Sequence, residues 1–168
     1  MATTFRLRVW TRFFASVEEV WALKTDGDHL RSEFPWFAPF RVDDEERLRA
    51  AFEACEPCEV DGRFGPAGLS WPLRLEAVER CVRYRDTSEN VLYSRFEHEH
   101  LFEAASDGCR YIDEVTFTPN GPAQKAVALS TLWVFRHRHR VTARKLPADT
   151  RTVGTGILRV LVEDSWED

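Results

Sequence analysis

The feature that most constrains the fold of this chain is a long region of alternating apolar and polar residues, from residue 71 to residue 119. A period of two is typical of strands that bury one face. It predicts four successive strands, at residues 71–79, 81–85, 91–104 and 109–119. The pair Asp107-Gly108 predicts a hairpin turn between the last two strands, and Asp61-Gly62 predicts an earlier turn. The sequence therefore predicts an antiparallel meander.

A long helix is predicted after the meander. Asn120-Gly121-Pro122 ends the alternating region, and no glycine or proline occurs from Ala123 to Leu146. At about 100° per residue, a helix here has one broad, mainly apolar face. That face contains Ala128, Leu129, Leu132, Phe135, Arg136, His139, Ala143 and Leu146. An amphipathic helix must bury such a face, and the meander is available to cover it.

The N-terminal part predicts one strand and several short helices. Residues 4–13 alternate strictly and predict a half-buried strand. Ser16 and Glu19 form a capping-box pattern, which predicts a helix that starts directly after Ser16. A second short helical segment is expected at residues 28–34, because a proline follows it. Acidic residues followed by an apolar face predict an extra helix near residues 43–54.

Composition narrows the class of protein. A chain of 168 residues suits one domain. Its 23 basic and 28 acidic residues are mixed along the chain and give a formal charge of -5, which excludes the basic footprint of a nucleic-acid-binding protein. No apolar run approaches the ~18 residues of a membrane span, and the N-terminus lacks a signal-peptide core. We therefore expect a soluble, cytoplasmic protein, in which the four cysteines are reduced thiols.

Together these elements predict one α+β domain at residues 1–146, with a curved antiparallel sheet wrapped around the long C-terminal helix. The short N-terminal helices and the extra helix near residues 43–54 belong to the same domain. Residues 147–168 are predicted to form a C-terminal extension, with an extra strand and an acidic tail. A sheet curved around a helix leaves room for a cavity between the two.

Four segments of the sequence resemble the START-like, or SRPBCC, superfamily, whose members have the helix-grip fold and include polyketide cyclases, dehydrases and lipid-transport proteins. The segments are ASVEEVWAL at residues 15–23, FEHEHLF at 96–102, DEVTFTPNG at 113–121 and FRHRH at 135–139. Their order and spacing cover residues 5–146. The helix at residues 45–54 and the long tail depart from the family's pattern, which leaves the pocket entrance and the oligomeric state open.

The resemblance implies a hydrophobic cavity that binds a lipid, a sterol, a polyketide, an aromatic compound or another apolar molecule, and residues 1–146 would then be a START-like ligand-binding domain. We expect a carrier or sensor of such a molecule, with no cofactor, no nucleic-acid partner and no membrane span. One alternative is a cyclase, aromatase or dehydratase that uses acid/base residues in the same cavity. Another is an interaction protein with a closed pocket, whose tail strand at residues 157–162 pairs with another chain in a homo-oligomer.

A histidine doublet is the main candidate for chemistry. Strand alternation places His98 and His100 together on the apolar, concave face, beside Phe96 and Phe102. If the hairpin turns at Ser106-Asp107, Asp113 lies opposite His100 and is expected to accept a hydrogen bond from it. These groups would anchor a polar ligand group, act as acid and base, or only satisfy one another and pin the sheet. His98, His100 and Asp113 are therefore the candidate catalytic residues.

A metal site is an alternative interpretation of the histidines. His98, His100 and His139 are conceivable ligands, but a zinc site needs a further donor. His137 lies about 200° from His139 on the helix and cannot face the same ion. The CEPC motif at residues 55–58 has no second Cys-x-x-Cys partner. No metal is therefore predicted.

The remaining candidates lie on the last helix and in one loop. Arg136 is expected near the buried stripe, paired with Asp113 or Glu114 or holding an acidic ligand group, whereas Arg138 is expected in solvent. The loop EFPWFAPF at residues 33–40 is a candidate lid, or a plug that seals the core. The predicted ligand-binding residues are Phe96, His98, His100, Phe102, Asp113, Val115, Phe117, Leu132, Phe135, Arg136, His139 and Trp36.

Overall fold

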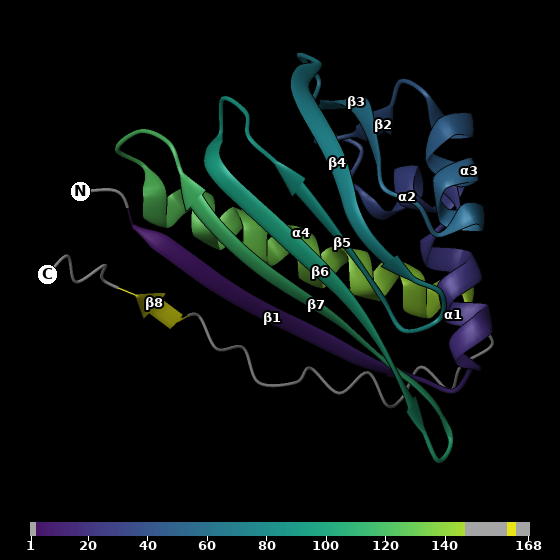
Figure 1. Cartoon of the computed structure of the whole chain (residues 1–168). Coiled ribbons are helices and arrows are strands. Elements are labelled where there is room, and N and C mark those ends of the chain that lie inside the picture. The colour runs from purple at the N-terminus through teal and green to yellow at the C-terminus, as the bar shows by residue number, and fades with distance from the viewer. Residues whose placement is uncertain (1–2, 147–160, 164–168) are drawn as a thin grey trace, which may run out of the picture.

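The fold is a curved sheet around one long helix. The computed structural model describes residues 3–146 and 161–163. In chain order the elements are β1 (Thr4–Phe13), α1 (Val17–Lys24), α2 (Gly27–Glu33), β2 (Phe40–Val42), α3 (Glu45–Ala54), β3 (Cys58–Phe64), β4 (Leu69–Glu79), β5 (Arg83–Ser88), β6 (Tyr93–Ala105), β7 (Gly108–Pro119), α4 (Gln124–Lys145) and β8 (Leu161–Glu163). The strands form one antiparallel sheet in the order β2-β3-β4-β5-β6-β7-β1-β8. Figure 1 shows α4 lying along the sheet, with α1, α2 and α3 gathered at one end. The predicted α+β helix-grip fold is confirmed.

The hairpin of β6 and β7 has the register that the sequence predicts. Ala105 pairs with Gly108, so the turn contains two residues, and His100 lies opposite Asp113. Gly108 has a φ of 146°, and a Cβ at this position would lie 2.0 Å from the carbonyl oxygen of Phe13. Only glycine fits this position, because the end of β1 packs directly against the hairpin.

The N-terminal helices are also close to the prediction. The Ser16 side chain accepts from the backbone N–H of Glu19, and the Glu19 carboxylate accepts from the backbone N–H of Ser16, so the predicted capping box starts α1. The Asp26 side chain caps α2, which ends at Glu33, and the Asp44 side chain caps α3. Local side-chain chemistry therefore decides where these helices begin.

One predicted turn is wrong. Asp61-Gly62 lies inside β3, and the chain instead reverses at Gly65 and Gly68, both of which have a positive φ. Gly62 occurs in this strand for a packing reason: a Cβ there would lie 2.8 Å from the carbonyl oxygen of Trp71 and 3.1 Å from the ring of Phe40. Close approach of a neighbouring strand and ring, and not a change of direction, requires this glycine.

The buried face of α4 is rotated from the predicted one. Its buried residues are Ala128, Thr131, Phe135, Arg138, His139, Thr142 and Ala143. Leu129, which the prediction places on the buried face, is 66% exposed. The prediction gave apolar residues the greatest weight, whereas Thr131 and Thr142 are buried because polar partners lie inside the fold. The Thr131 hydroxyl is 2.8 Å from the hydroxyl of Tyr93, and the Thr142 hydroxyl donates to Glu33 over 2.6 Å.

Two hydrophobic clusters form the core, and the histidine doublet lies between them. Trp21 and Tyr84 belong to the first cluster, while Phe117 and Phe135 belong to the second. The His100 ring stacks on Tyr84 with centroids 3.8 Å apart, and the His98 ring meets Phe135 edge-on with centroids 4.8 Å apart. Aromatic packing from both sides therefore holds the two imidazoles in position.

The last described strand extends the sheet on the side of β1. β8 pairs with β1 of the same chain, with Phe5 opposite Val162. Residues 157–160 of the predicted tail strand, and the acidic tail at 164–168, lie outside the described residues. Among the helices that the structure describes, none is long and apolar enough to cross a membrane.

Candidate functional site

A cavity of about 370 Å³ lies between the sheet, α4 and the helices α2 and α3. A volume of this size is within the ~300–1,000 Å³ range of small-molecule sites. Most of its walls are apolar, and aromatic rings from α3, α4, the strands β2 to β6 and the loop before β2 contribute to them. The apolar lining contains Leu30, Phe34, Phe37, Ala38, Phe40, Val42, Leu48, Phe52, Phe64, Trp71, Leu73, Leu75, Leu92, Tyr93, Phe96, Val127, Trp133, Val134 and Phe135.

The loop before β2 lies at the rim of this cavity. Phe37 lines the cavity and packs on Trp133 of α4, with ring centroids 5.7 Å apart. Both rings are partly exposed. Trp36, which the sequence suggests as a ligand contact, is 90% exposed and does not line the cavity. Phe37 therefore occupies the position that the prediction gives to Trp36.

The cavity has a polar region where β5 and β6 face it. His98 and His100 project into it from β6, and Asp86 projects from β5 directly opposite His98. One carboxylate oxygen of Asp86 lies 3.1 Å from Nε2 of His100 and 3.4 Å from Nδ1 of His98. All three side chains are almost fully buried. Asp86 was not among the predicted site residues.

Asp113 lies beneath the histidines and joins three of them. Its Oδ1 is 3.0 Å from Nε2 of His98 and 3.2 Å from Nδ1 of His100, and its Oδ2 is 3.1 Å from Nε2 of His139. The Tyr111 hydroxyl also donates to Oδ1. Burial favours the neutral form of Asp113, but the adjacent His98 and the hydrogen bonds from His100 and His139 outweigh it and hold the pKa well below its usual range.

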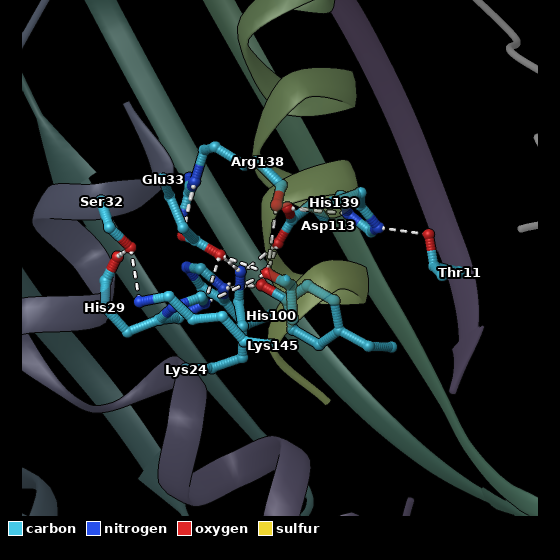
Figure 2. Close-up of polar contacts among 12 residues, drawn as sticks. Thr11, Lys24, His29, Ser32, Glu33, His100, Asp113, Arg138, His139 and Lys145 are labelled. Carbon is cyan, nitrogen blue, oxygen red and sulfur yellow. Dashed lines mark hydrogen bonds and ion pairs between the residues drawn. The ribbon is translucent and has the colours of Figure 1, made fainter. Parts of the chain in front are cut away.

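The predicted pairing of His100 with Asp113 is therefore only part of the arrangement. The register is correct, but His98 makes the shorter contact with the carboxylate, while Nδ1 of His100 also hydrogen-bonds to the hydroxyl of Tyr111. His139 is fixed on its other side by the hydroxyl of Thr11, 2.7 Å from Nδ1. Figure 2 shows His139 between Thr11 and Asp113.

Burial lowers the pKa values of two of these imidazoles, His98 and His139. Burial and the neighbouring His100 lower the pKa of His98 to about 4. Burial likewise lowers the pKa of His139, against the opposing effect of Asp113. Burial also raises the pKa values of Tyr84 and Tyr111 well above their usual value, so both hydroxyls keep their protons.

A second buried network centres on Glu33, the last residue of α2 (Figure 2). Its carboxylate accepts from Lys24 of α1, from Nε of Arg138 at 3.0 Å and from the hydroxyl of Thr142 at 2.6 Å. Nε2 of His29 lies 3.1 Å from the same carboxylate. Three helices are therefore joined through one buried acidic group.

Opposite charges keep this network ionised. Burial favours the neutral form of Glu33, but Lys24 and Arg138 outweigh it and hold the pKa well below its usual value. Burial lowers the pKa of Lys24, and the attraction of Glu33 opposes this only in part. Burial also disfavours the charge of Arg138, but Glu33 and Asp113 overcome that effect and raise its pKa. Lys24 and Arg138 both line the cavity, so its polar region contains paired cations as well as imidazoles.

The predicted roles of the two helix arginines are wrong. Arg138, expected in solvent, is 5% exposed and bound to Glu33. Arg136 does not line the cavity, and Glu114, one of its two predicted partners, pairs with Arg8 at 2.9 Å. The cause is the rotation of α4, because the face that carries Arg138 is the face that meets α2.

Apart from Trp36 and Arg136, which do not line the cavity, the predicted ligand-binding residues divide into three groups. Those that line the cavity are Phe96, His98, His100 and Phe135. Those that are buried without lining it are Phe102, Asp113, Val115 and His139. Phe117 and Leu132 line a separate hollow of about 230 Å³ between β1 and α4. Cavity residues that sequence reasoning missed include Lys24, Tyr84, Asp86 and Arg138, and strand alternation on β5 would have placed Tyr84 and Asp86 on one face.

Among the described residues, one group of histidine, cysteine, aspartate and glutamate side chains has the spacing of a metal site. It consists of Asp86, His98 and His100, whose ligand atoms all lie within 4.8 Å of one another. The two cysteines of the CEPC motif are free: Cys55 ends α3 in a left-handed conformation, and Cys58 begins β3.

Comparison with known protein families gives a match over part of the chain. A family described as a Domain of unknown function (DUF8410) matches residues 69–146. No curated protein matches the sequence.

Several solved structures are similar to this chain. Protein CV1439 from Chromobacterium violaceum has 15% identity and a TM-score of 0.66, covering 86% of this chain and 98% of its own. TTHA0849 from Thermus thermophilus has 18% identity and a TM-score of 0.62, covering 83% of this chain and 94% of its own. The di-domain ARO/CYC StfQ of the steffimycin biosynthetic pathway has 9% identity and a TM-score of 0.62, and the match covers 84% of this chain and 50% of StfQ.

Proposed function

Because the chain has the START-like, SRPBCC-type helix-grip fold, we propose that it binds a small, mainly apolar molecule in the cavity between the sheet and α4. The observation that carries this proposal is the cavity of about 370 Å³, with aromatic walls and one polar region. Such a combination is typical of sites that bury most of a ligand and use a few polar groups to orient it.

The two regions of the cavity specify the kind of ligand. Phe40, Trp71 and Phe96 offer ring faces and edges to an aromatic or polycyclic body. At the polar region, Asp86 and His100 would contact a hydroxyl or carbonyl group of the ligand. A lipid, sterol or polyketide with one such group fits this description. We propose that the protein carries or senses such a molecule.

Native mass spectrometry of the freshly purified protein tests this proposal. We expect an additional mass that is released on denaturation and that belongs to an apolar molecule with an oxygen-containing group. The same molecule, once identified, should raise the melting temperature of ligand-free protein. Protein that carries no such mass, and that no member of a lipid, sterol and aromatic polyketide library stabilises, would refute the proposal.

A second candidate function is catalysis of a cyclase, aromatase or dehydratase type. The arrangement that favours it is His98, whose two ring nitrogens face Asp86 at the cavity and Asp113 beneath it. An imidazole between two carboxylates is suited to move a proton between buried and cavity-facing groups. His98→Gln, His100→Gln and Asp113→Asn should then each abolish turnover of the identified ligand, and unchanged turnover in all three variants would exclude this function.

Two further expectations belong with this proposal. The four cysteines are free thiols, which supports a reducing, cytoplasmic location. The cavity argues against the alternative of an interaction protein with a closed pocket.

A homo-oligomer formed through the C-terminal extension at residues 147–168 is a separate proposal. Determining the size of the protein before and after truncation at Leu146 would test it.

A further inference from the structure

Three potential metal ligands meet at the polar region of the cavity. Asp86 on β5 and His98 on β6 are directly opposite in the sheet, and His100 follows two residues later on the same face. Oδ2 of Asp86 is 3.4 Å from Nδ1 of His98 and 3.1 Å from Nε2 of His100. The strand register thus brings two imidazoles and one carboxylate to one point.

The separations suit a first-row transition metal. Zinc binds histidine nitrogen and carboxylate oxygen at about 2.0–2.2 Å. Two ligands at such a distance, with an angle of about 90–110° at the ion, are about 3.0–3.4 Å apart. The two measured separations, 3.1 and 3.4 Å, lie in this range.

The ring nitrogen of each histidine that points away from Asp86 contacts other polar groups. Nε2 of His98 is 3.0 Å from Asp113, and Nδ1 of His100 contacts the hydroxyl of Tyr111 and the carboxylate of Asp113. The Tyr111 hydroxyl itself donates to Asp113. Metal-binding histidines nearly always donate their second N–H to a carboxylate or carbonyl in this way, because that contact fixes the ring and its tautomer.

The two ring nitrogens that face Asp86 are Nδ1 of His98 and Nε2 of His100, and the positions of the ring hydrogens decide whether they can donate to it. If both rings are neutral, each has one N–H, and the ionised Asp113 accepts the hydrogen of His98. Tyr111 gives its hydrogen to Asp113, so Nδ1 of His100 must carry the hydrogen of that ring. Nδ1 of His98 and Nε2 of His100 then present lone pairs to the Asp86 carboxylate, which is itself only an acceptor. Three electron-pair donors that face one another in a buried site need a positive charge between them, which a metal ion or one added proton supplies.

We propose that Asp86, His98 and His100 bind one divalent first-row transition-metal ion, such as Zn²⁺ or Fe²⁺, with its remaining coordination positions open to the cavity. Two histidines and one carboxylate are the ligand set of several catalytic zinc sites and of non-haem iron sites. All three residues line the cavity, so a ligand hydroxyl or carbonyl reaches the open positions. Asp113 and Tyr111 are positioning residues in this arrangement.

This site goes beyond the sequence-based expectation of no metal. That expectation considered His98, His100 and His139, but His139 donates to Asp113 from the far side and is not one of the ligands. The ligand that the sequence argument lacked is Asp86, which is separated from His98 by a strand connection. The metal site also goes beyond the proposed function, since the apolar walls would bind a ligand without an ion.

The test uses the full chain without a histidine tag. Protein treated with EDTA and exchanged into metal-free buffer is titrated with Co²⁺ by visible absorption and with Zn²⁺ by calorimetry. We expect one ion per chain, a cobalt spectrum without a thiolate charge-transfer band, and a higher melting temperature with Zn²⁺ but not with Mg²⁺. Asp86→Asn should weaken Zn²⁺ binding by about 100-fold or more, and Asp113→Asn by about 10–100-fold.

Matched controls separate this site from other donors. His137→Ala and the double variant Cys55→Ser/Cys58→Ser should bind Zn²⁺ like the wild type, and circular dichroism checks that each variant is folded. Absence of saturable Co²⁺ and Zn²⁺ binding to the wild type would overturn the proposal. Binding that persists in Asp86→Asn but disappears in the cysteine double variant would also overturn it. An apolar ligand that still binds such metal-free protein would leave the proposed function intact.

Discussion

The buried carboxylate of Glu33 offers a demanding test of the structure, because the variant Glu33→Gln removes one charge from a site that contains two cations. Glu33 is 1% exposed, and its two oxygens accept from Lys24, Arg138 and Thr142. Glutamine retains one acceptor oxygen but turns its other end into an NH₂ donor, which must face Lys24 or Arg138. The two cations then remain buried without a hydrogen-bonded counter-charge.

The expected cost follows from this loss. Removing one partner of a buried ion pair destabilises a protein by about 3–5 kcal/mol. That is a large part of the ~5–15 kcal/mol by which domains are stable. At about 2–4 °C per kcal/mol for a domain of this size, the melting temperature should fall by about 6–20 °C.

Urea denaturation of wild type and variant measures this free energy of unfolding directly. The matched control is Glu114→Gln, which breaks a partly exposed pair with Arg8 (Nε to Oε1, 2.9 Å) and should cost less than about 1 kcal/mol. A loss below about 1 kcal/mol for Glu33→Gln, at an unchanged m-value, would show that the carboxylate does not hold the three helices together.

Three further predictions concern the cap of α1, the β6–β7 hairpin and the pH dependence of the Glu33 network. Ser16→Ala removes the capping box with Glu19 and should lower the free energy of unfolding by about 1 kcal/mol, measured by urea denaturation; no change would show that α1 does not depend on its cap. Gly108→Ala places a Cβ 2.0 Å from the carbonyl oxygen of Phe13 at a positive φ, and should cost about 2 kcal/mol or more; a variant as stable as wild type would contradict the hairpin geometry. The folded-state pKa of Glu33 lies below its unfolded value of about 4.3, so its contribution is present above that pH and is lost as the pH falls through the folded pKa. The stability difference between wild type and Glu33→Gln, measured from pH 6 to pH 3, should therefore shrink on acidification, and a constant difference would contradict the ion pairs of Glu33 with Lys24 and Arg138.

Local patterns predicted most of the fold. Alternation located β1 and the strands from β4 to β7, and the two-residue turn placed His100 opposite Asp113. Capping residues located α1. These features succeed because each depends on residues that are close in the sequence and on a fixed period.

The polar interior was harder to predict, since its partners come from distant segments. Arg138 is buried because Glu33, 105 residues earlier, supplies the opposite charge. The periodicity of the sequence carries no information about such a pairing. A prediction that gave apolar residues on α4 the greatest weight therefore placed Arg138 on the exposed face. Asp86 was missed because the predicted strand at residues 81–85 ended before it, although alternation continued from Tyr84 places Asp86 on the same face.

Binding of 2-naphthol, a bicyclic aromatic with one hydroxyl, tests the central claim most directly through two substitutions on β4. Leu73 lines the cavity and Leu69 does not, so Leu73→Trp fills part of the cavity while Leu69→Trp makes the same change outside it. Fluorescence titration should show one saturable site in the wild type and in Leu69→Trp, and at least ~10-fold weaker binding in Leu73→Trp. No saturable binding to the wild type, or equal affinity in both variants, would contradict the account of the cavity as a binding site.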